Sequence, residues 1–310
     1  MIQGNKTIGK EMYDVVILGS GPAGLTSAIY CGRAKKSALV LAGESFGGQT
    51  GEIAKLENYP GWNGSGMELI QFMKNQATSF GAKIEFASAT DIKFNDDGTY
   101  SVVCDNNKTF DARVVILATG SRARRLEIEG AKEFFGHGVS YCATCDGFFY
   151  AGREVLVIGG GNAALNDALY LSDVAKKVKI VYRKPSFTRA EAVTRERVLE
   201  KENIECIYNT ELKSITKACD SDRLIATTTT GETIECDGIF VAIGHEANTD
   251  YLPETIKRDE MGRLDPHDLP RGMFVAGDIK SNIHMQIATA VGTACIASMD
   301  AVKYLNSLEQ

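Results

Sequence analysis

Two cysteines separated by two residues, Cys142 and Cys145, are the strongest sign of chemistry in this sequence, and Asp146 follows them directly. Only a thiolate attacks a disulfide. CxxC spacing at a turn or helix start lowers the pKa of one thiol and keeps the other close enough to resolve a mixed disulfide. The motif therefore predicts thiol–disulfide exchange.

A metal site is the competing interpretation of paired cysteines. Zinc would require two further ligands at suitable spacing, but the four histidines form no HxxxH motif or other pair; they are His137, His245, His267 and His284. The other cysteines stand singly, as free buried cysteines commonly do; they are Cys31, Cys104, Cys206, Cys219, Cys236 and Cys295. We therefore expect no metal and no disulfide scaffold.

Two glycine-rich loops flank the dithiol in the sequence, and each follows a short apolar run. They are Gly19-Ser20-Gly21-Pro22-Ala23-Gly24 and Gly159-Gly160-Gly161-Asn162-Ala163-Ala164. Glycines in such loops allow a tight turn and a close approach to a pyrophosphate, whose charge is met by the following helix N-terminus. A dithiol between two nucleotide sites predicts that electrons pass from one cofactor through another to a disulfide.

Residues after the second fingerprint predict which nicotinamide nucleotide binds there. An acid at the end of the second strand would accept a hydrogen bond from the ribose of NAD, whereas cations favour the 2′-phosphate of NADP. This chain has Arg183 and Lys184, then Arg189, and no acid until Glu191. The cluster predicts NADPH, and Ala164 at the third fingerprint position is compatible with the motif.

Strand-like and helix-like runs alternate from residue 13 onward, which is typical of parallel sheets with crossover helices. We expect helices at residues 25–34, 162–172 and 286–306. We expect strands at 38–41, 83–86, 100–104, 109–111, 113–117, 179–182, 204–208, 212–215, 224–229 and 233–236. The two copies of this plan start about 140 residues apart.

The C-terminal part, with the motif at 272–278 and the helix at 286–306, has no counterpart after Gly120 and most simply completes the first domain. The expected fold is α/β, with two Rossmann-like (three-layer ββα) dinucleotide-binding domains, the second inserted into the first. We expect residues 1–120 and 247–310 to form one domain, and residues 121–246 to form the domain that carries the dithiol.

Composition limits the class of protein. The chain has 310 residues, 44 % of them hydrophobic, and a formal net charge of −6, so we expect a soluble globular protein without a basic stripe for nucleic acid. No segment approaches 18 uninterrupted apolar residues, and residues 1–12 lack the apolar core of a signal peptide. We therefore expect a cytoplasmic protein with no membrane partner.

Further motifs in this order resemble the low-molecular-weight bacterial and archaeal thioredoxin reductases, over residues 13–305. Besides the first fingerprint they are Gly47-Gly48-Gln49, Glu57-Asn58-Tyr59-Pro60-Gly61, Ala118-Thr119-Gly120, residues 141–147, and Gly277-Asp278 with Gln286. The resemblance implies that the first domain binds FAD through Gly19, Ser20, Gly21, Pro22, Ala23, Gly24, Glu44, Gly48, Gln49, Asn58, Thr119, Gly120, Gly277, Asp278, Met285 and Gln286. It implies that NADPH contacts Gly159, Gly161, Asn162, Ala163, Ala164, Arg183, Lys184 and Arg189.

The resemblance also implies a role for each dithiol residue. Cys142 would attack the protein substrate, thioredoxin, Cys145 would lie against the flavin, and Asp146 would be the general acid that protonates the leaving thiolate. The resemblance further implies a homodimer, and an inserted domain that rotates about two connections, here near residues 120–121 and 244–247.

Three departures from the family pattern leave the electron donor open. Tyr182 and Lys184 stand where the family has histidine and arginine, and Met285 stands where it usually has arginine. Lysine keeps the charge but loses the fork that pairs bidentately with phosphate. The alternatives are NADH, a disulfide reductase supplied by ferredoxin or a deazaflavin, a reductase for a peroxiredoxin or glutaredoxin-like partner, and a non-catalytic flavin redox sensor.

Overall fold

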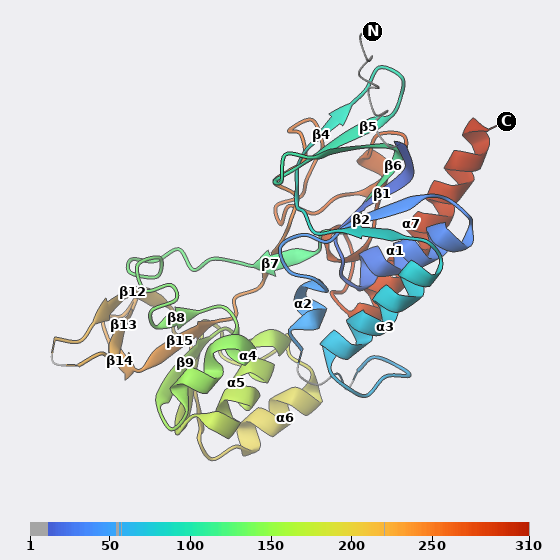
Figure 1. Ribbon diagram of the computed structural model, residues 1–310. Coiled ribbons are helices and arrows are strands. Elements are labelled where there is room, and N and C mark those ends of the chain that lie inside the picture. The colour runs from blue at the N-terminus through green and yellow to red at the C-terminus, as the bar shows by residue number, and fades with distance from the viewer. Residues whose placement is uncertain (1–11, 54–55, 57, 220, 310) are drawn as a thin grey trace, which may run out of the picture. The chain divides into compact units, whose positions relative to one another are not determined.

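The structure, a computed structural model, describes residues 12–53, 56, 58–219 and 221–309 (Figure 1). The chain divides into two compact units. The first comprises Met1–Arg122 and Glu246–Gln310, and the second comprises Ala123–His245. The chain crosses between the two units after Arg122 and again after His245. At these crossings β7 (Ser121–Ala123) pairs with β16 (His245–Ala247).

The first unit is built on a seven-stranded sheet in the order β3-β2-β1-β6-β5-β4, with β17 also paired to β6. Strands β1 (Met12–Leu18), β2 (Ala38–Leu41), β3 (Lys83–Glu85), β6 (Thr109–Leu117) and β17 (Met273–Val275) are parallel. Strands β4 (Ala89–Phe94) and β5 (Tyr100–Cys104) form an antiparallel extension. Strand β6 continues through both of the shorter strands that we expected at 109–111 and 113–117.

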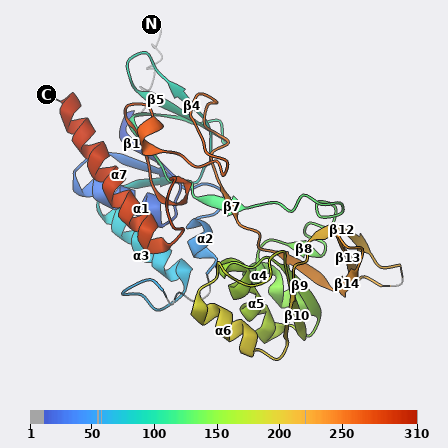
Figure 2. The ribbon, with the colours of Figure 1, turned by 180° about the vertical axis from the view of Figure 1, so that it is seen from behind.

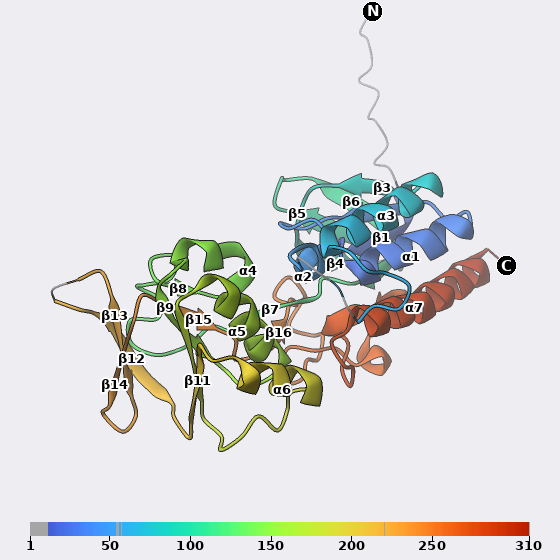
Figure 3. The ribbon, with the colours of Figure 1, turned by 90° about the horizontal axis from the view of Figure 1, so that it is seen from below.

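Helices cover one face of this sheet. Helix α1 (Pro22–Arg33) packs between α3 (Gly66–Ser79) and α7 (Ile287–Leu308), as Figures 2 and 3 show. The buried face of α7 consists mainly of alanines three or four residues apart, and such small side chains allow a close approach to the sheet. The opposite face buries a separate core that includes Leu252, Leu264 and Ile279.

The second unit repeats this plan on a smaller scale. Its five-stranded parallel sheet has the order β11 (Ile204–Tyr208), β10 (Lys177–Tyr182), β9 (Glu154–Ile158), β15 (Gly238–Val241) and β8 (Val139–Ser140). One face packs against α5 (Asn162–Val174), α6 (Ala192–Glu200) and the short helix α4 (Ala143–Asp146). The other face buries the antiparallel strands β12 (Leu212–Lys217), β13 (Leu224–Thr228) and β14 (Thr233–Cys236).

These sheets confirm the expected α/β fold class with two parallel-sheet domains. The expected strands at 38–41, 100–104, 204–208 and 233–236 have these bounds in the structure. Helices α3 and α6 and strand β4 are among the elements that we did not expect. Within the described residues, no helix combines the length and the apolar character needed to cross a bilayer.

Candidate functional site

The first fingerprint folds into a turn that only glycine permits at two positions. Gly19 has φ +110°, and a Cβ atom there would lie 2.3 Å from the carbonyl oxygen of Ala118. A Cβ atom on Gly24 would lie 1.8 Å from the carbonyl oxygen of Gly19. The turn is fixed to the sheet because the Gly19 N–H donates to the Leu41 carbonyl at 2.8 Å.

The N-terminus of α1, directly after this turn, is free to receive an anion. Gly21 is the N-cap residue, no side chain caps the helix, and its first turn contains Pro22 but no acid. A Cβ atom on Gly21 would have only the Gly47 carbonyl oxygen within 4 Å, at 3.7 Å. Free N–H groups beside open space fit the pyrophosphate of a dinucleotide. Ser20 braces the loop, since its hydroxyl donates to Ala42 and accepts from the Gly47 N–H.

Two of the other predicted FAD residues, Gln49 and Asp278, come together at Ser121. Gln49 Nε2 donates to the carbonyl and hydroxyl oxygens of Ser121, at 2.8 and 2.9 Å. Burial raises the pKa of the Asp278 carboxyl, while a hydrogen bond from Ser121 and the charge of Arg263 oppose that shift. A half-buried carboxylate of this kind is suited to accept hydrogen bonds from sugar hydroxyls.

The remaining predicted FAD residues differ in the hydrogen bonds that they make. Asn58 Nδ2 donates to Gln286 Oε1 at 3.1 Å, and Thr119 Oγ1 donates to the Asn248 carbonyl at 2.6 Å. By contrast, Glu44 is exposed and makes no hydrogen bond or ion pair within the described part of the chain. Gly277 donates its backbone N–H to Thr293 Oγ1 at 3.0 Å. No hydrogen bond with a side chain is made within the described residues by four others, namely Gly48, Gly120, Ala23 and Met285. Glu57, quoted for the resemblance, lies outside the described residues.

The second fingerprint makes a similar turn with different packing. Gly159 has φ +142°, and a Cβ atom there would lie 2.2 Å from the Ala242 carbonyl oxygen. A Cβ atom on Gly160 would collide with the ring of Tyr182, whereas nothing lies within 4 Å of one on Gly161. Gly161 is the N-cap of α5, and no side chain caps that helix. Ala163 is exposed, and Ala164 is completely buried.

The basic cluster after β10 is accessible. Arg183 is exposed and lies 3.8 Å from Glu211, while Lys184 and Arg189 have no ion-pair partner within the described residues. The sequence analysis did not assign Glu191 a site role. Its backbone N–H donates to Asn162 Oδ1 at 2.7 Å, and its carboxylate accepts from Asn162 Nδ2 at 3.2 Å. An acid is therefore attached directly to the fingerprint.

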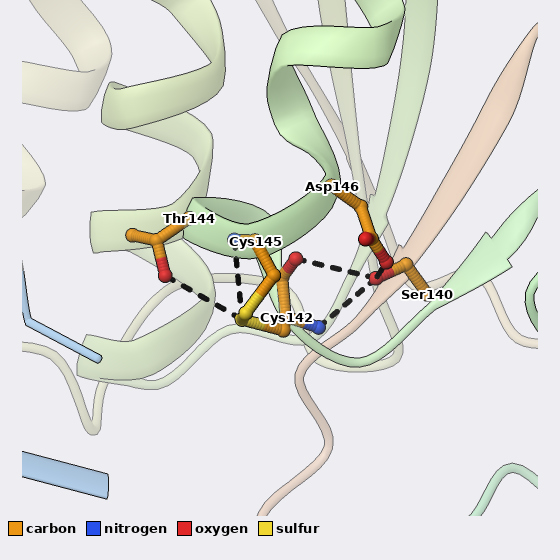
Figure 4. Close-up of a disulfide and its surroundings, with 5 residues drawn as sticks. All are labelled: Ser140, Cys142, Thr144, Cys145 and Asp146. Carbon is orange, nitrogen blue, oxygen red and sulfur yellow. Dashed lines mark hydrogen bonds between the residues drawn. A yellow bond between two sulfur atoms is a disulfide. The ribbon is translucent and has the colours of Figure 1, made fainter. Parts of the chain in front are cut away.

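The two cysteines of the CxxC motif form a disulfide at the start of α4, as Figure 4 shows. Cys142 is the N-cap residue, and its Sγ accepts from the Cys145 N–H at 3.2 Å. Ala143 anchors the motif because it is buried in the core beneath α5. After reduction, the same N–H group would stabilise a thiolate on Cys142, which fits an attacking thiol.

Asp146 is connected to Cys142 through Ser140 (Figure 4). The Ser140 hydroxyl lies 2.6 Å from Asp146 Oδ2, and it accepts from the Cys142 N–H at 3.0 Å. Ser140 therefore orients the carboxylate and the cysteine backbone together. We did not predict a site role for Ser140, because the family motif at residues 141–147 begins one residue later.

Two phenylalanines after the motif were also missed. Phe148 is 74 % exposed and Phe149 is 71 % exposed. Large exposed aromatic side chains commonly mark an interaction site. Their signal in the sequence was their position, two and three residues after the Asp146 that follows the dithiol.

The buried cysteines outside this motif do not share its properties. Cys31, Cys104 and Cys236 are buried, and burial raises the pKa of the Cys31 and Cys236 thiols to about 12. These thiols are therefore protonated and unreactive at neutral pH.

Comparisons with known proteins agree with this arrangement. Residues 13–294 match the pyridine nucleotide-disulphide oxidoreductase family. The thioredoxin reductase of Treponema pallidum is 38 % identical, over 96 % of this chain and 98 % of its own length. The bifunctional thioredoxin reductase/thioredoxin of Mycobacterium leprae is also 38 % identical over 96 % of this chain, which spans only 66 % of that protein.

Solved structures lead to the same assignment. Lactococcus lactis thioredoxin reductase superposes with a TM-score of 0.88 at 34 % identity, covering 95 % of this chain and 99 % of that one. A ferredoxin-flavin thioredoxin reductase from Clostridium acetobutylicum matches with a TM-score of 0.51 at 25 % identity, covering 96 % and 99 %. With the disulfide and both fingerprints formed, this chain belongs to the pyridine nucleotide-disulphide oxidoreductase family, as a low-molecular-weight thioredoxin reductase.

Proposed function

We propose that this protein is an NADPH-dependent thioredoxin-disulfide reductase. Electrons would pass from NADPH, bound by the second unit, through FAD, bound by the first, to the Cys142–Cys145 disulfide and then to thioredoxin. The observation that carries the proposal is the disulfide itself. It lies in a unit with an open nucleotide fingerprint, and the same chain contains a second such fingerprint.

The residues of the first unit fit FAD. The uncapped start of α1 would hold the pyrophosphate, and Asp278 would accept hydrogen bonds from hydroxyl groups of the cofactor. FAD supplies, when bound, the ability to take up a hydride and return two electrons to sulfur. Gln49 and Asn58 would then orient the cofactor, because both side chains are already held by neighbours in the same unit.

In the second unit, Gly161 leaves the start of α5 open to the pyrophosphate of NADPH. Arg183, Lys184 and Arg189 would hold the 2′-phosphate. The last two have no competing ion pair within the described residues, and the pair between Arg183 and Glu211 is long at 3.8 Å. A phosphate could replace such an exposed partner at little cost.

The reduced dithiol would act through two exchange steps. The Cys142 thiolate would attack a thioredoxin sulfur, forming a mixed disulfide and releasing one thiolate, which would take a proton from Asp146. Cys145 would then attack Cys142 Sγ, releasing the second thioredoxin thiol and reforming the Cys142–Cys145 disulfide. Two electrons and two protons are transferred in each cycle. Phe148 and Phe149, exposed beside the motif, would contact the protein substrate.

A second candidate is a flavin disulfide reductase with another electron donor. Two observations favour it: the likeness to a ferredoxin-flavin thioredoxin reductase, and the contact of Glu191 with Asn162 in the second fingerprint. An acid near the nucleotide ribose favours NADH over NADPH. Lys184 also lacks the planar fork of arginine.

An anaerobic stopped-flow experiment distinguishes these donors. The oxidised protein is mixed with NADPH or with NADH, and flavin absorbance is followed. We expect fast bleaching by NADPH alone. Slow or absent bleaching by both nucleotides, in a protein whose flavin dithionite still reduces, would contradict the proposal and favour another donor.

The dithiol roles are tested with two matched variants, Cys142→Ser and Cys145→Ser. Each should lower thioredoxin reduction at least roughly 1,000-fold, because each removes one of the two sulfur atoms of the exchange. Flavin reduction by NADPH should survive in Cys142→Ser. Loss of flavin reduction in that variant would contradict the role given to Cys142.

The phosphate contacts are tested by the triple variant Arg183→Gln, Lys184→Gln and Arg189→Gln. Charged hydrogen bonds contribute about 1.5–3 kcal/mol each, so the KM for NADPH should rise roughly 100-fold or more. The reaction with NADH should change little, because NADH lacks the 2′-phosphate. Lys213→Gln removes an exposed charge elsewhere in the second unit and serves as the control. An equal loss with NADH would show that the cluster does not recognise the phosphate.

We also propose that the protein is a homodimer. Ile296 and Met299 on α7 are 63 % and 60 % exposed, and apolar side chains on one helix face commonly mark a subunit interface. Sedimentation equilibrium of the flavin-loaded protein should give about twice the monomer mass of 33.6 kDa. A monomer at micromolar concentration would contradict this part of the proposal.

A further inference from the structure

Arg125 is held by two aromatic rings. Its guanidinium carbon lies 4.4 Å from the ring centroid of Phe135 and 4.8 Å from that of Tyr141. The two rings lie 5.7 Å apart and are tilted by 58°. The Tyr141 hydroxyl is fixed in turn, because it accepts from the Leu126 N–H at 2.9 Å. We call Arg125, Phe135 and Tyr141 the arginine clasp.

The arginine clasp is attached to the strand that leads into the dithiol. Tyr141 lies between β8 and Cys142, so its Cα atom is about 3.8 Å from that of Cys142. The loop that carries Phe135 folds back onto the same strand: the Gly136 N–H donates to the Val139 carbonyl, and the Val139 N–H donates to the Phe134 carbonyl, both at 2.9 Å. The position of the guanidinium is therefore fixed relative to the redox motif within one unit.

The charge of Arg125 is not neutralised. Within the described residues it is exposed and has no ion-pair or hydrogen-bond partner. Arg122, by contrast, is held by carboxylates, because it contacts Glu246 and Asp250 at 2.8 and 2.5 Å. Stacking occupies the face of a guanidinium and leaves its N–H edge available for a planar acceptor. The arginine clasp thus presents an oriented cation with unused donors.

We propose that the arginine clasp binds a carboxylate on the protein substrate, close to the disulfide that Cys142 attacks. The occupant is an acidic side chain of thioredoxin, which would accept two hydrogen bonds from the guanidinium edge. Phe148 and Phe149 supply apolar contacts after the redox motif, whereas the clasp supplies a directional polar contact before it. This inference rests on the proposed thioredoxin reductase activity and names a recognition element for its partner.

Both a protein carboxylate and the nicotinamide nucleotide are anionic, and the position of Arg125 in the fold favours the protein carboxylate as the occupant. The 2′-phosphate already has a basic cluster at residues 183–189, which follows β10. Arg125 instead precedes β8 and α4 in the chain. An arginine before the dithiol is instead placed to meet a surface that must approach Cys142. Stacking on Phe135 and Tyr141 restricts the side chain, which lowers the ordering cost of the contact.

The test compares a protein substrate with a small uncharged one. Purified bacterial thioredoxin and bis(2-hydroxyethyl) disulfide are each assayed with the flavin-loaded wild type and with Arg125→Gln and Arg125→Glu. We expect kcat/KM for thioredoxin to fall roughly tenfold in Arg125→Gln and further in Arg125→Glu, mainly through KM. Turnover of the small disulfide should not change, because it carries no carboxylate.

Two further variants separate charge from packing. Arg124→Gln removes the neighbouring exposed charge, which makes no aromatic contact among the described residues, and should leave kcat/KM for thioredoxin nearly unchanged. Phe135→Leu keeps the charge but removes one ring, and should raise KM by about threefold because the guanidinium is less well oriented. Neutralising the acidic residues of thioredoxin one at a time should identify one whose loss has no added effect in Arg125→Gln.

The outcomes distinguish a failure of the recognition role of Arg125 from a failure of the proposed thioredoxin reductase activity. If the wild type reduces thioredoxin and both Arg125 variants match it, the arginine clasp has no recognition role and the inference is wrong. If the variants lose activity equally on the small disulfide, the clasp only supports the fold of the motif, which also overturns the inference. If the wild type reduces only the small disulfide, the proposed thioredoxin reductase function fails, and this inference fails with it.

Discussion

The two fingerprints differ at the third position, where the first unit has Gly24 and the second has Ala164. A methyl group at residue 24 would lie 1.8 Å from the carbonyl oxygen of Gly19. In the second unit the corresponding methyl group is present, and it is completely buried in the core below α5. Helix α1 therefore approaches its turn more closely than α5 does. Two turns with the same pattern can differ in how closely the helix packs on the strand.

The sharpest test of this difference is the exchange of the two residues. Gly24→Ala should force α1 away from the turn, cost at least about 3 kcal/mol by overpacking, and abolish FAD binding. Ala164→Gly should cost only about 1 kcal/mol, from a lost buried methyl group and a more flexible backbone. The measurements are the ratio of flavin to protein absorbance and the midpoint of thermal unfolding.

Equal effects of the two substitutions would contradict the comparison. So would a Gly24→Ala protein that retains its flavin, since the overlap with Gly19 would then be relieved without a shift of the helix. Because flavin binding itself stabilises the first unit, the unfolding midpoints should also be compared after the flavin has been removed from both variants.

Gly21 and Gly161 are the second glycines of the two fingerprints. They should behave alike although the fingerprints differ at the third position. Each begins its helix, and neither has protein atoms within 3.6 Å of a built Cβ atom. A methyl group there should be tolerated by the fold but should occupy the space of the pyrophosphate. Gly21→Ala should therefore weaken FAD binding, and Gly161→Ala should raise the KM for NADPH, each roughly 30- to 100-fold.

The readouts of these two variants are independent. Flavin content reports on Gly21→Ala, and stopped-flow reduction of the bound flavin reports on Gly161→Ala. Unfolding midpoints close to that of the wild type are expected for both apoproteins. If Gly161→Ala lost its flavin, the fingerprints could not be assigned to separate cofactors in this way.

The sequence predicted these turns well because they depend on local chemistry. Gly19 and Gly159 need positive φ, and each follows an apolar strand, so residue type and spacing define the local conformation. Helix α3 was also predictable: Ser65 and Glu68 form a capping box that the sequence displays. We did not predict this helix.

Other features could not be obtained from spacing. Strand β6 pairs with β1 along one edge and changes partner along the other. There Thr109–Ala112 pairs with β5, and Val115–Leu117 pairs with β17, which lies more than 150 residues later in the chain. The bond from Ser140 to Asp146 and the clasp around Arg125 depend on side-chain directions that follow from the folded loop. Tertiary contacts of this kind leave no periodic signal in a single sequence.

A smaller difference between the units concerns their buried carboxylates. Burial raises the pKa of Asp278 in the first unit, against opposing effects of Ser121 and Arg263. In the second unit, burial alone raises the pKa of Asp167, on α5, from 3.8 to about 7. Folding therefore makes Asp167 bind a proton between about pH 4 and pH 7. Its contribution to the free energy of unfolding falls as the pH rises through that window and stays low above it.

Asp167→Asn removes this penalty without changing the shape of the side chain. The variant should match the wild type near pH 4 and should be more stable by roughly 2 kcal/mol at pH 8, since local relaxation reduces the cost implied by the shift. Asp278→Asn should gain less, because Ser121 and Arg263 already favour its charged form. The measurement is hydrogen exchange of peptides from α5, because it reports on the stability of the second unit. Fluorescence of the single tryptophan, Trp62, would report on the first unit instead. If the stability gain were the same at pH 4 and pH 8, ionisation of Asp167 would not destabilise the folded protein. The contrast between the two carboxylates would then be lost.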